Sequence, residues 1–157
     1  MTTDSTGGGE FHLAGGKNAS DFIHFMAQKI PLVLYKEAET ATKGQSHSPV
    51  WHELRFARIT ASKLYEAAHC NTYDGTLVET IIGAYKLKDT VAMKRGRALE
   101  KHVLNVVQKK VGLKFKNSGL FLLPNCPILG ASPDGISDNF VVEIKCPSKT
   151  TGTAVTR

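Results

Sequence analysis

The sequence predicts an α/β fold in which helices come first and a small sheet follows. Apolar residues recur at helical spacing over residues 19–30 and again over residues 90–111. Residues 119–145 are instead rich in β-branched and aromatic residues, with turn-forming residues between them. The chain has 157 residues, of which 41% are hydrophobic, which suits one domain with a core. This order of elements favours an antiparallel sheet that packs against the second, longer helix.

The first fifty residues are expected to lie outside the main domain. Residues 1–17 are rich in glycine and lack hydrophobic periodicity, so we expect a mobile tail. Residues 18–50 predict a helical extension, over residues 19–30 with Ser20 or Asp21 as N-cap, and then a polar linker over residues 43–49. The main domain is therefore expected to span residues 51–157.

Four helices are predicted between residues 51 and 111. They cover residues 51–58, a segment from Thr60 or Ser62 to about residue 69, residues 76–82, and a segment from residue 89 or 90 to 111. Thr76 and Glu79 have the spacing of a capping box. The last helix is the strongest prediction, since it has an apolar stripe and Gly112 as a stop signal. The stripe consists of Leu99, Val103, Val106, Val107 and Val111.

A strand is expected at residues 119–123, followed by a hairpin of residues 129–137 and 140–145. Asp138-Asn139 fits a two-residue turn of the kind that prefers positive φ. A tight turn sets Asp134 opposite Glu143, where like charges destabilise a sheet unless a divalent cation lies between them. Lys145 projects from the same face as Glu143 because strand side chains alternate. The other face, predicted to be core, carries Phe140, Val142 and Ile144.

Glu100 is a candidate third carboxylate for this hairpin. It adjoins Leu99 and precedes Val103 by three residues, so it can lie at the edge of the apolar stripe and face the sheet. Three carboxylates without a His or Cys cluster point to a hard cation, Mg²⁺ with Mn²⁺ as a substitute. Taken one at a time, these residues also fit an exposed helical glutamate, a plain turn and a solvated strand face.

Composition restricts the partners and the compartment. The formal net charge is +6, which favours a polyanion. The three cysteines are far apart and form no CxxC pair, so neither a disulfide framework nor a zinc finger follows. No apolar run reaches about 20 residues and the N-terminus lacks the pattern of a signal peptide, so we expect no membrane partner. The expected location is intracellular, and nuclear if the source is eukaryotic.

Several motifs together resemble the lambda exonuclease / YqaJ-type viral recombinase family of the PD-(D/E)XK nuclease superfamily. Pro133-Asp134 and Glu143-Ile144-Lys145 match the two superfamily motifs, and residues 51–55, 58–62 and 96–100 match further family motifs in the same order. The resemblance covers about residues 51–149. It implies a restriction-endonuclease-like core, a mixed sheet flanked by helices. The family continues with a further helix and strand, so we expect this chain to lack C-terminal elements of the fold.

The resemblance also implies roles for individual residues. Glu100, Asp134 and Glu143 would hold the metal together with the Ile144 backbone carbonyl, and Lys145 would act on the attacking water. The phosphate-binding residues implied are Arg55, Ser62 and Ser132, of which Arg55 would grip a terminal 5′ phosphate. A guanidinium binds phosphate bidentately, and a serine at a helix start adds a donor there. A surface arginine and a simple N-cap are the other interpretations of Arg55 and Ser62.

Three functions remain open from the sequence. The first, which the resemblance implies, is a Mg²⁺-dependent exonuclease that degrades linear double-stranded DNA from 5′-phosphorylated ends for recombination or repair. A ring-shaped trimer and a single-strand annealing partner would accompany it. The second is an endonuclease that uses the same metal site. The third is a non-catalytic nucleic-acid-binding module whose phosphate contacts are Lys94, Arg95, Arg97, Lys109, Lys110, Lys114 and Lys116.

Overall fold

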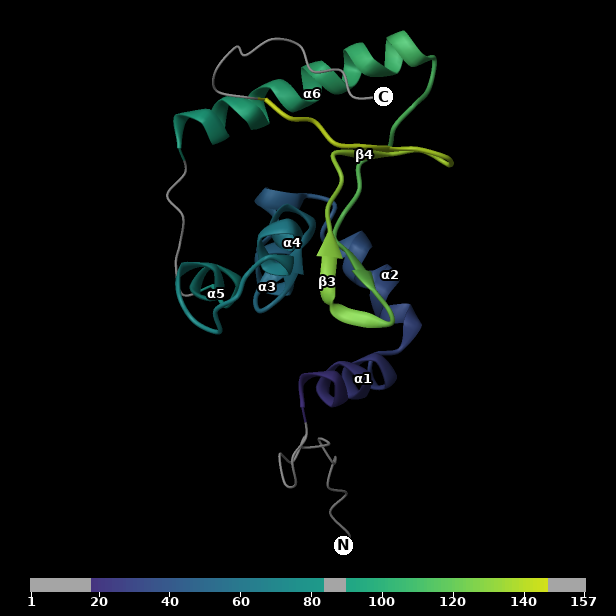
Figure 1. Cartoon of the computed structure of the whole chain (residues 1–157). Coiled ribbons are helices and arrows are strands. Elements are labelled where there is room, and N and C mark those ends of the chain that lie inside the picture. Colours follow the sequence, from purple (N-terminus) through teal and green to yellow (C-terminus); the bar gives the residue numbers. More distant parts are fainter. Residues whose placement is uncertain (1–17, 84–89, 147–157) are drawn as a thin grey trace, which may run out of the picture.

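The computed structural model describes residues 18–83 and 90–146 (Figure 1). The helices are α1 Ala19–Lys29, α2 Leu32–Ala41, the 3₁₀ helix η1 Gln45–His47, α3 Pro49–Arg55, α4 Ala61–Ala68, α5 Thr76–Ile81 and α6 Val91–Val111. The strands are β1 Ile59–Thr60, β2 Phe121–Leu123, β3 Cys126–Ala131, β4 Gly135–Ile136 and β5 Val141–Val142. The predicted tail at residues 1–17 lies outside the described residues. Among those described, no helix is long and apolar enough to cross a membrane.

The larger sheet has three strands in the order β1-β3-β2 and is mixed. β1 runs parallel to β3, with Ile59 paired to Leu129, whereas β2 runs antiparallel to β3. The mixed sheet flanked by helices is therefore confirmed, and the expectation of a purely antiparallel sheet is wrong. The error arises because β1 has only two residues, Ile59 and Thr60, and no sequence pattern can mark so short a strand.

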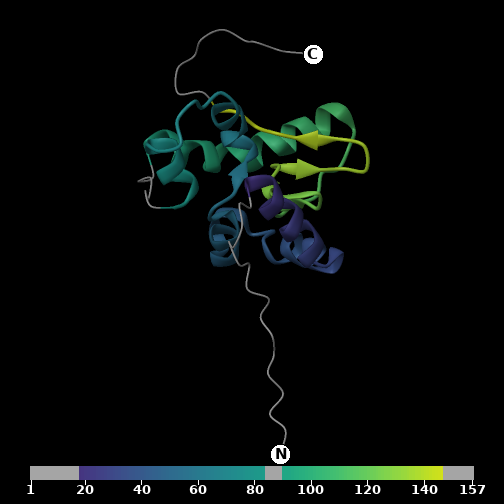
Figure 2. The ribbon, with the colours of Figure 1, turned by 60° about the horizontal axis from the view of Figure 1, so that its bottom comes forward.

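Helices from the first half of the chain cover this sheet. α1 packs against β3, α2 against β2, and α4 against β1 and β3. The longest helix, α6, lies instead along the β4–β5 hairpin, as both ribbon views show (Figures 1 and 2). Its Leu104 side chain approaches the backbone of Gly135. The single antiparallel sheet predicted to pack against the long helix is not formed, since its strands are divided between two sheets, but the expected closeness of that helix to the hairpin is confirmed.

The hairpin forms a separate two-stranded sheet with the expected register. Gly135 pairs with Val142 and Ile136 with Val141. The predicted first strand, residues 129–137, is nevertheless divided, because β3 ends at Ala131 and β4 begins at Gly135. Residues 132–134 link the two sheets, and Pro133 cannot donate to a ladder because it has no N–H. This division makes residues 132–134 a connector between sheets.

Two details of the hairpin differ from prediction. Neither Asp138 nor Asn139 has positive φ. The turn is closed by Ser137 instead, whose N–H donates to the Phe140 carbonyl at 2.8 Å and whose hydroxyl accepts from the Phe140 N–H at 3.1 Å. Phe140 is 58% exposed, so its assignment to the core is wrong. Val142 and Ile144 on the same face are half-buried.

Helix caps are partly as expected. Thr90 caps α6 by accepting from the Met93 N–H, and Gly112 ends that helix with φ of 69°. Asn18, rather than Ser20 or Asp21, is the N-cap of α1, and Asp21 completes its capping box. Thr76 lies inside α5 after Gly75, so it does not act as the N-cap. A capping pattern thus marked the starts of α1, α5 and α6 to within a few residues.

The N-terminal extension is attached to the sheet through α2, a helix that sequence analysis did not predict. Thr42, at its C-terminal end, is fully buried and its hydroxyl accepts from the Leu120 N–H at 2.7 Å. The Glu39 carboxylate accepts from the Gly119 N–H at 3.1 Å. Leu120 and Tyr35 are the buried large hydrophobic residues of the described chain. The extension therefore supplies part of the core.

We expect Gly119→Ala to reduce the free energy of unfolding by about 2–3 kcal/mol, the usual cost of overpacking a rigid site. A methyl group there would lie 1.8 Å from the Glu39 carbonyl oxygen, which belongs to the α2 backbone. The matched control is Gly96→Ala in α6, where nothing lies within 4 Å and alanine favours the helix. Urea unfolding of the two variants checks this. Equal stability of both would contradict the close contact.

Candidate functional site

The site is built around the connector of residues 132–134. Pro133 is buried, and its carbonyl accepts two hydrogen bonds, one from Gln45 Nε2 at 2.9 Å and one from Ser118 Oγ at 2.6 Å. Gln45 Nε2 also donates to the Ser118 carbonyl at 3.0 Å. A buried carbonyl with two donors is held in one orientation. Asp134 consequently leaves the connector in a defined direction.

Gln45 is a site residue that sequence analysis missed. It lies in the polar segment that was interpreted as a linker, and η1 begins there. Its φ is 44°, a left-handed conformation that costs free energy for a residue other than glycine. The tertiary contacts of its side chain maintain this conformation. A single polar residue between Gly44 and Ser46 carries no pattern that would predict such contacts.

Asp134 joins the two strands of the hairpin with its side chain. Its N–H donates to the Val142 carbonyl at 3.0 Å, and its Oδ2 accepts from the Ile144 N–H at 2.5 Å. The ladder therefore stops at Gly135 and Val142, and beyond it the Asp134 carboxylate replaces a backbone acceptor. The direct pairing of Asp134 with Glu143 that sequence analysis expected is not formed, because this carboxylate bonds the strand instead.

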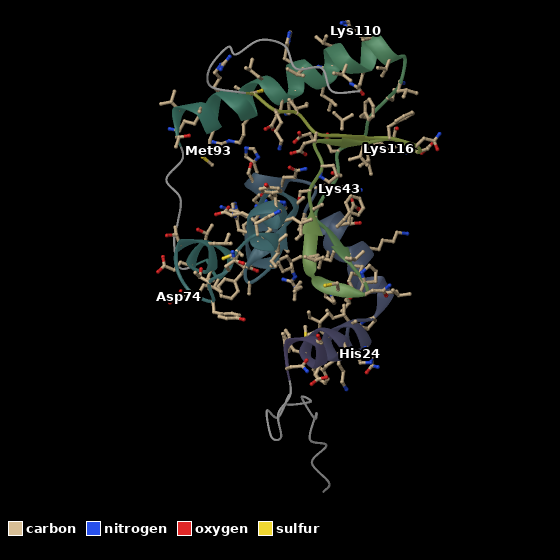
Figure 3. The ribbon with its side chains drawn as sticks, in the orientation of Figure 1. His24, Lys43, Asp74, Met93, Lys110 and Lys116 are labelled. Carbon is tan, nitrogen blue, oxygen red and sulfur yellow. The ribbon has the colours of Figure 1, made fainter. Side chains whose placement is uncertain are left out.

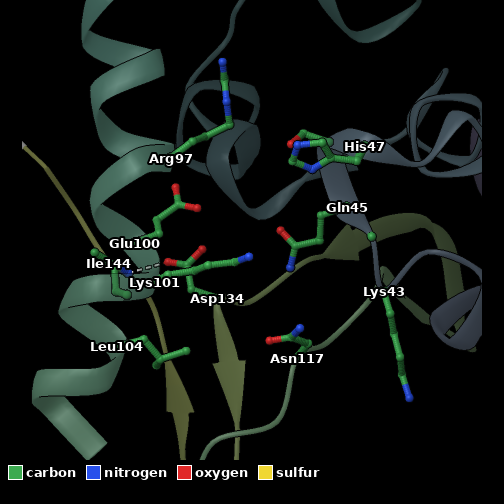
Figure 4. A pocket seen from close by; sticks show the side chains of 12 residues that line it. Lys43, Gln45, His47, Arg97, Glu100, Lys101, Leu104, Asn117, Asp134 and Ile144 are labelled. Carbon is green, nitrogen blue, oxygen red and sulfur yellow. Dashed lines mark hydrogen bonds between the residues drawn. The ribbon is translucent and has the colours of Figure 1, made fainter.

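Glu100 and Asp134 face the same groove from different elements (Figure 4). Burial and then the negative charge of Asp134 raise the pKa of Glu100, while Arg97 opposes the shift. Burial also raises the pKa of Asp134, which the Ile144 N–H opposes and Glu143 reinforces. Both carboxyl groups are partly desolvated and repel each other, which is the electrostatic setting of a cation site.

Glu143 and Lys145 form an ion pair on one face of the strand segment, as the alternation of side chains predicted. The hydrogen bond from Lys145 to Glu143 is the main cause that raises the pKa of the lysine. Both side chains are largely exposed, at 52% for Glu143 and 75% for Lys145. The Glu143 carboxylate is therefore turned toward Lys145 rather than toward Asp134.

Within residues 18–83 and 90–146, no three His, Cys, Asp or Glu side chains lie close enough together to share one metal ion. The fold brings Glu100 and Asp134 to one groove, where Ile144 also lies, but leaves Glu143 in the adjoining cavity. Carboxylate oxygens are the ligands of Mg²⁺ and Mn²⁺. Glu100 and Asp134 are donors of the kind that a hard cation takes, and Glu143 lies outside their groove.

The adjoining cavity, of about 510 Å³, holds the three residues predicted to bind phosphate. Arg55 stacks on the Trp51 ring at 3.9 Å from its centroid, and burial lowers the pKa of its guanidinium. Trp51 Nε1 donates to Ser132 Oγ at 2.9 Å, and Ser62 Oγ lies 3.1 Å from Thr60 Oγ1. Trp51 thus positions both Arg55 and Ser132, a role that sequence analysis did not assign.

A family model described as the YqaJ-like viral recombinase domain matches residues 50–157. Two curated relatives are similar over much of the chain. The alkaline nuclease of human herpesvirus 7 (strain JI) is 34% identical over 121 residues, which are 74% of this chain and 24% of the relative. The alkaline nuclease of human herpesvirus 6B (strain Z29) is 32% identical over 109 residues, 68% of this chain and 21% of the relative. The chain thus spans about a quarter of their length.

A solved structure is also similar, the alkaline exonuclease LHK-Exo from Laribacter hongkongensis. Its sequence is 26% identical and the TM-score is 0.50. The match covers 62% of this chain and 53% of that one. It supports the same mixed α/β core that the strand order shows.

We expect Glu100→Gln to raise the melting temperature at pH 7 in EDTA by about 2 °C, a small gain because both carboxylates are partly solvated. Since folding raises the pKa of Glu100, its contribution to stability is full below the unfolded pKa, about 4.3, and is lost as the pH rises through the folded value. The gain should therefore shrink toward pH 4. Circular dichroism melts from pH 4 to 8 measure it, with Glu37→Gln on the exposed face of α2 as control. A gain that is independent of pH would contradict the repulsion.

Proposed function

This chain belongs to the YqaJ-like viral recombinase domain family, and from that membership we propose that it is a Mg²⁺-dependent exonuclease of linear double-stranded DNA. The proposal includes degradation from 5′-phosphorylated ends, in recombination or repair. The relatives, an alkaline nuclease and an alkaline exonuclease, support the reaction class. The single observation that carries the proposal is the junction of a carboxylate groove with a cavity that presents Arg55 and Lys145.

Four groups would hold the metal: the carboxylates of Glu100, Asp134 and Glu143 and the backbone carbonyl of Ile144. When bound, Mg²⁺ would polarise a phosphoryl oxygen and lower the pKa of a water ligand. The raised pKa values of Glu100 and Asp134 support this assignment, because a cation relieves the repulsion between them. Mn²⁺ has the same preference for oxygen ligands and would substitute.

The remaining residues would bind and orient the DNA end. Arg55 is preorganised by its stacking on Trp51, and a fixed guanidinium can hold a terminal phosphate with two parallel hydrogen bonds. Ser132 and Ser62 would add hydroxyl donors from the other walls of the cavity. Lys145, once Glu143 turns toward the metal, would present its ammonium group to the water or to the developing charge.

Two other functions keep some support. An endonuclease would use the same carboxylates and differ only at the phosphate cavity. A nucleic-acid-binding module without catalysis would need only the basic residues of the chain. The ion pair between Glu143 and Lys145 favours this function, because a closed pair keeps both residues from their proposed catalytic roles. Such binding would weaken steeply with salt and need no divalent ion. The ring trimer and the annealing partner remain part of the exonuclease proposal alone.

We predict that Asp134→Asn lowers kcat/KM on linear DNA at least about 100-fold, the range seen when a charge-stabilising group is removed. The asparagine oxygen can still accept from the Ile144 N–H, so the melting temperature should change little. The matched control is Asp138→Asn in the exposed hairpin turn. A gel assay of a labelled linear duplex with Mg²⁺, with Mn²⁺ and with EDTA measures the activity of both variants. Retention of the DNA without degradation in any metal would favour the binding module.

We predict that Arg55→Ala reduces the preference for 5′-phosphorylated over 5′-hydroxyl ends by about 10–100-fold, since a hydrogen bond to a charged group contributes about 1.5–3 kcal/mol. Arg55→Lys keeps the charge but loses the bidentate geometry, so an intermediate preference is expected. Initial rates on two duplexes that differ only in the end group give the ratio. Internal cuts that ignore the end group in the wild type would establish the endonuclease instead.

A further inference from the structure

The groove that contains Glu100 and Asp134 has a second wall that the proposed chemistry does not use. The groove has a volume of about 380 Å³. One wall is a single face of α6, halfway between Met93 and Lys110 (Figure 3), and the other is the segment of residues 43–47. The α6 face consists of Arg97, Glu100, Lys101 and Leu104, spaced as neighbours on a helix. Figure 4 shows the two walls facing each other above Asp134 and Asn117.

Lys101 is the cation that reaches farthest into this groove. Its side chain extends from α6 across the space beside Asp134 (Figure 4). It is exposed, and in the part of the chain that the structure describes it has no hydrogen-bond or ion-pair partner. Lys43, by contrast, points away from the groove and pairs with Glu39 at 3.7 Å. A lysine ammonium offers three donors, so Lys101 is ready to bind an anion.

His47 and Asn117 approach the same space from two other segments. Both line the groove and both are exposed. Over the described ranges, neither side chain has a hydrogen-bond partner. Three polar side chains from α6, η1 and the segment before β2 therefore border one groove next to a predicted metal ligand.

The groove and the Arg55 cavity both border the connector of residues 132–134. Asp134 lines the groove and Glu143 lines the cavity, and Gln45 is the residue that lines both. A strand whose 5′ phosphate is bound at Arg55 and whose next phosphodiester lies between Asp134 and Glu143 would reach the groove with its following nucleotides, because the groove begins at Asp134.

We propose that this groove binds the sugar-phosphate backbone of the cleaved strand on the 3′ side of the scissile bond, with Lys101 on the first phosphate there. His47 and Asn117 supply further donors to the same backbone. The assignment rests on the proposed exonuclease function, because the cavity at Arg55 sets the direction of the strand. It adds three DNA-binding residues, of which Lys101 lies in α6 and His47 and Asn117 lie outside that helix.

The test measures whether the effect of removing one side chain depends on the charge of one particular phosphate. Duplexes with a 5′ phosphate carry one uncharged methylphosphonate at the first, second, third or fourth linkage beyond the scissile bond. Wild type, Lys101→Ala, Asn117→Ala and the control Lys36→Ala are compared, since Lys36 is exposed on α2 and lines none of the cavities described above. Cleavage with Mg²⁺ gives kcat/KM, and fluorescence anisotropy with Ca²⁺ gives affinity without needing turnover.

The expected result is a loss of about tenfold in wild-type kcat/KM and affinity at the first linkage, as one charged contact provides. Lys101→Ala should lose as much on unmodified DNA and little more on the modified duplex, because both changes remove the same contact. Its salt dependence of binding should fall by about 0.9 in slope. Lys36→Ala should keep the wild-type pattern.

The two proposals fail in different ways. If each methylphosphonate lowers kcat/KM and affinity by the same factor in Lys101→Ala as in the wild type, at all four linkages, the groove assignment is overturned even if the exonuclease is active. Coupling of Lys101 to the first linkage in the Ca²⁺ measurement, without cleavage in any metal, would support the groove and overturn the exonuclease. Coupling of Lys101 to the terminal 5′ phosphate, tested with a duplex that ends in a 5′ hydroxyl, would reverse the strand direction and refute the assignment.

Discussion

The structure depends on how the buried Pro133 carbonyl is held. Two donors, from Gln45 and Ser118, converge on this one acceptor where the chain crosses from the larger sheet to the hairpin. Removing either donor would leave a polar group short of partners in a buried place, which costs more than a hydrogen bond contributes when formed. Because the carbonyl cannot rotate, the following residue presents its carboxylate to α6. The geometry of the groove is thus set by a backbone contact outside the group of charged residues.

Around that fixed point the charges are arranged at a cost to the fold. Glu100 and Asp134 are partly buried and repel each other, and Arg97 offsets only some of this. The fold offsets part of this repulsion, because the Asp134 carboxylate accepts a hydrogen bond from the Ile144 N–H of the hairpin. Strain and repulsion of this kind concentrate where a protein binds a ligand, since the ligand relieves them. The third carboxylate, that of Glu143, is neutralised by its ion pair with Lys145.

Sequence reasoning succeeded where a local pattern carried the information. Thr90 and Gly112 marked the ends of α6, and the alternation in residues 140–145 placed Glu143 and Lys145 on one face. It failed where tertiary contacts decide. The strand β1 is too short to have a period, and Pro133 divided a strand that its neighbours favoured. Gln45 adopts its left-handed conformation for contacts made 73 and 88 residues away, which no local pattern encodes.

The attachment of α2 has a consequence for where this domain can be separated from its surroundings. The matching family model begins at residue 50, which suggests that position as a natural place to cut the chain. Such a fragment would lose Thr42 and Gln45, so the Leu120 amide would lose its acceptor and the Pro133 carbonyl one of its two donors. The boundary recognised by sequence similarity is therefore narrower than the set of residues that share the core, which includes residues of α2 and Thr42 after it.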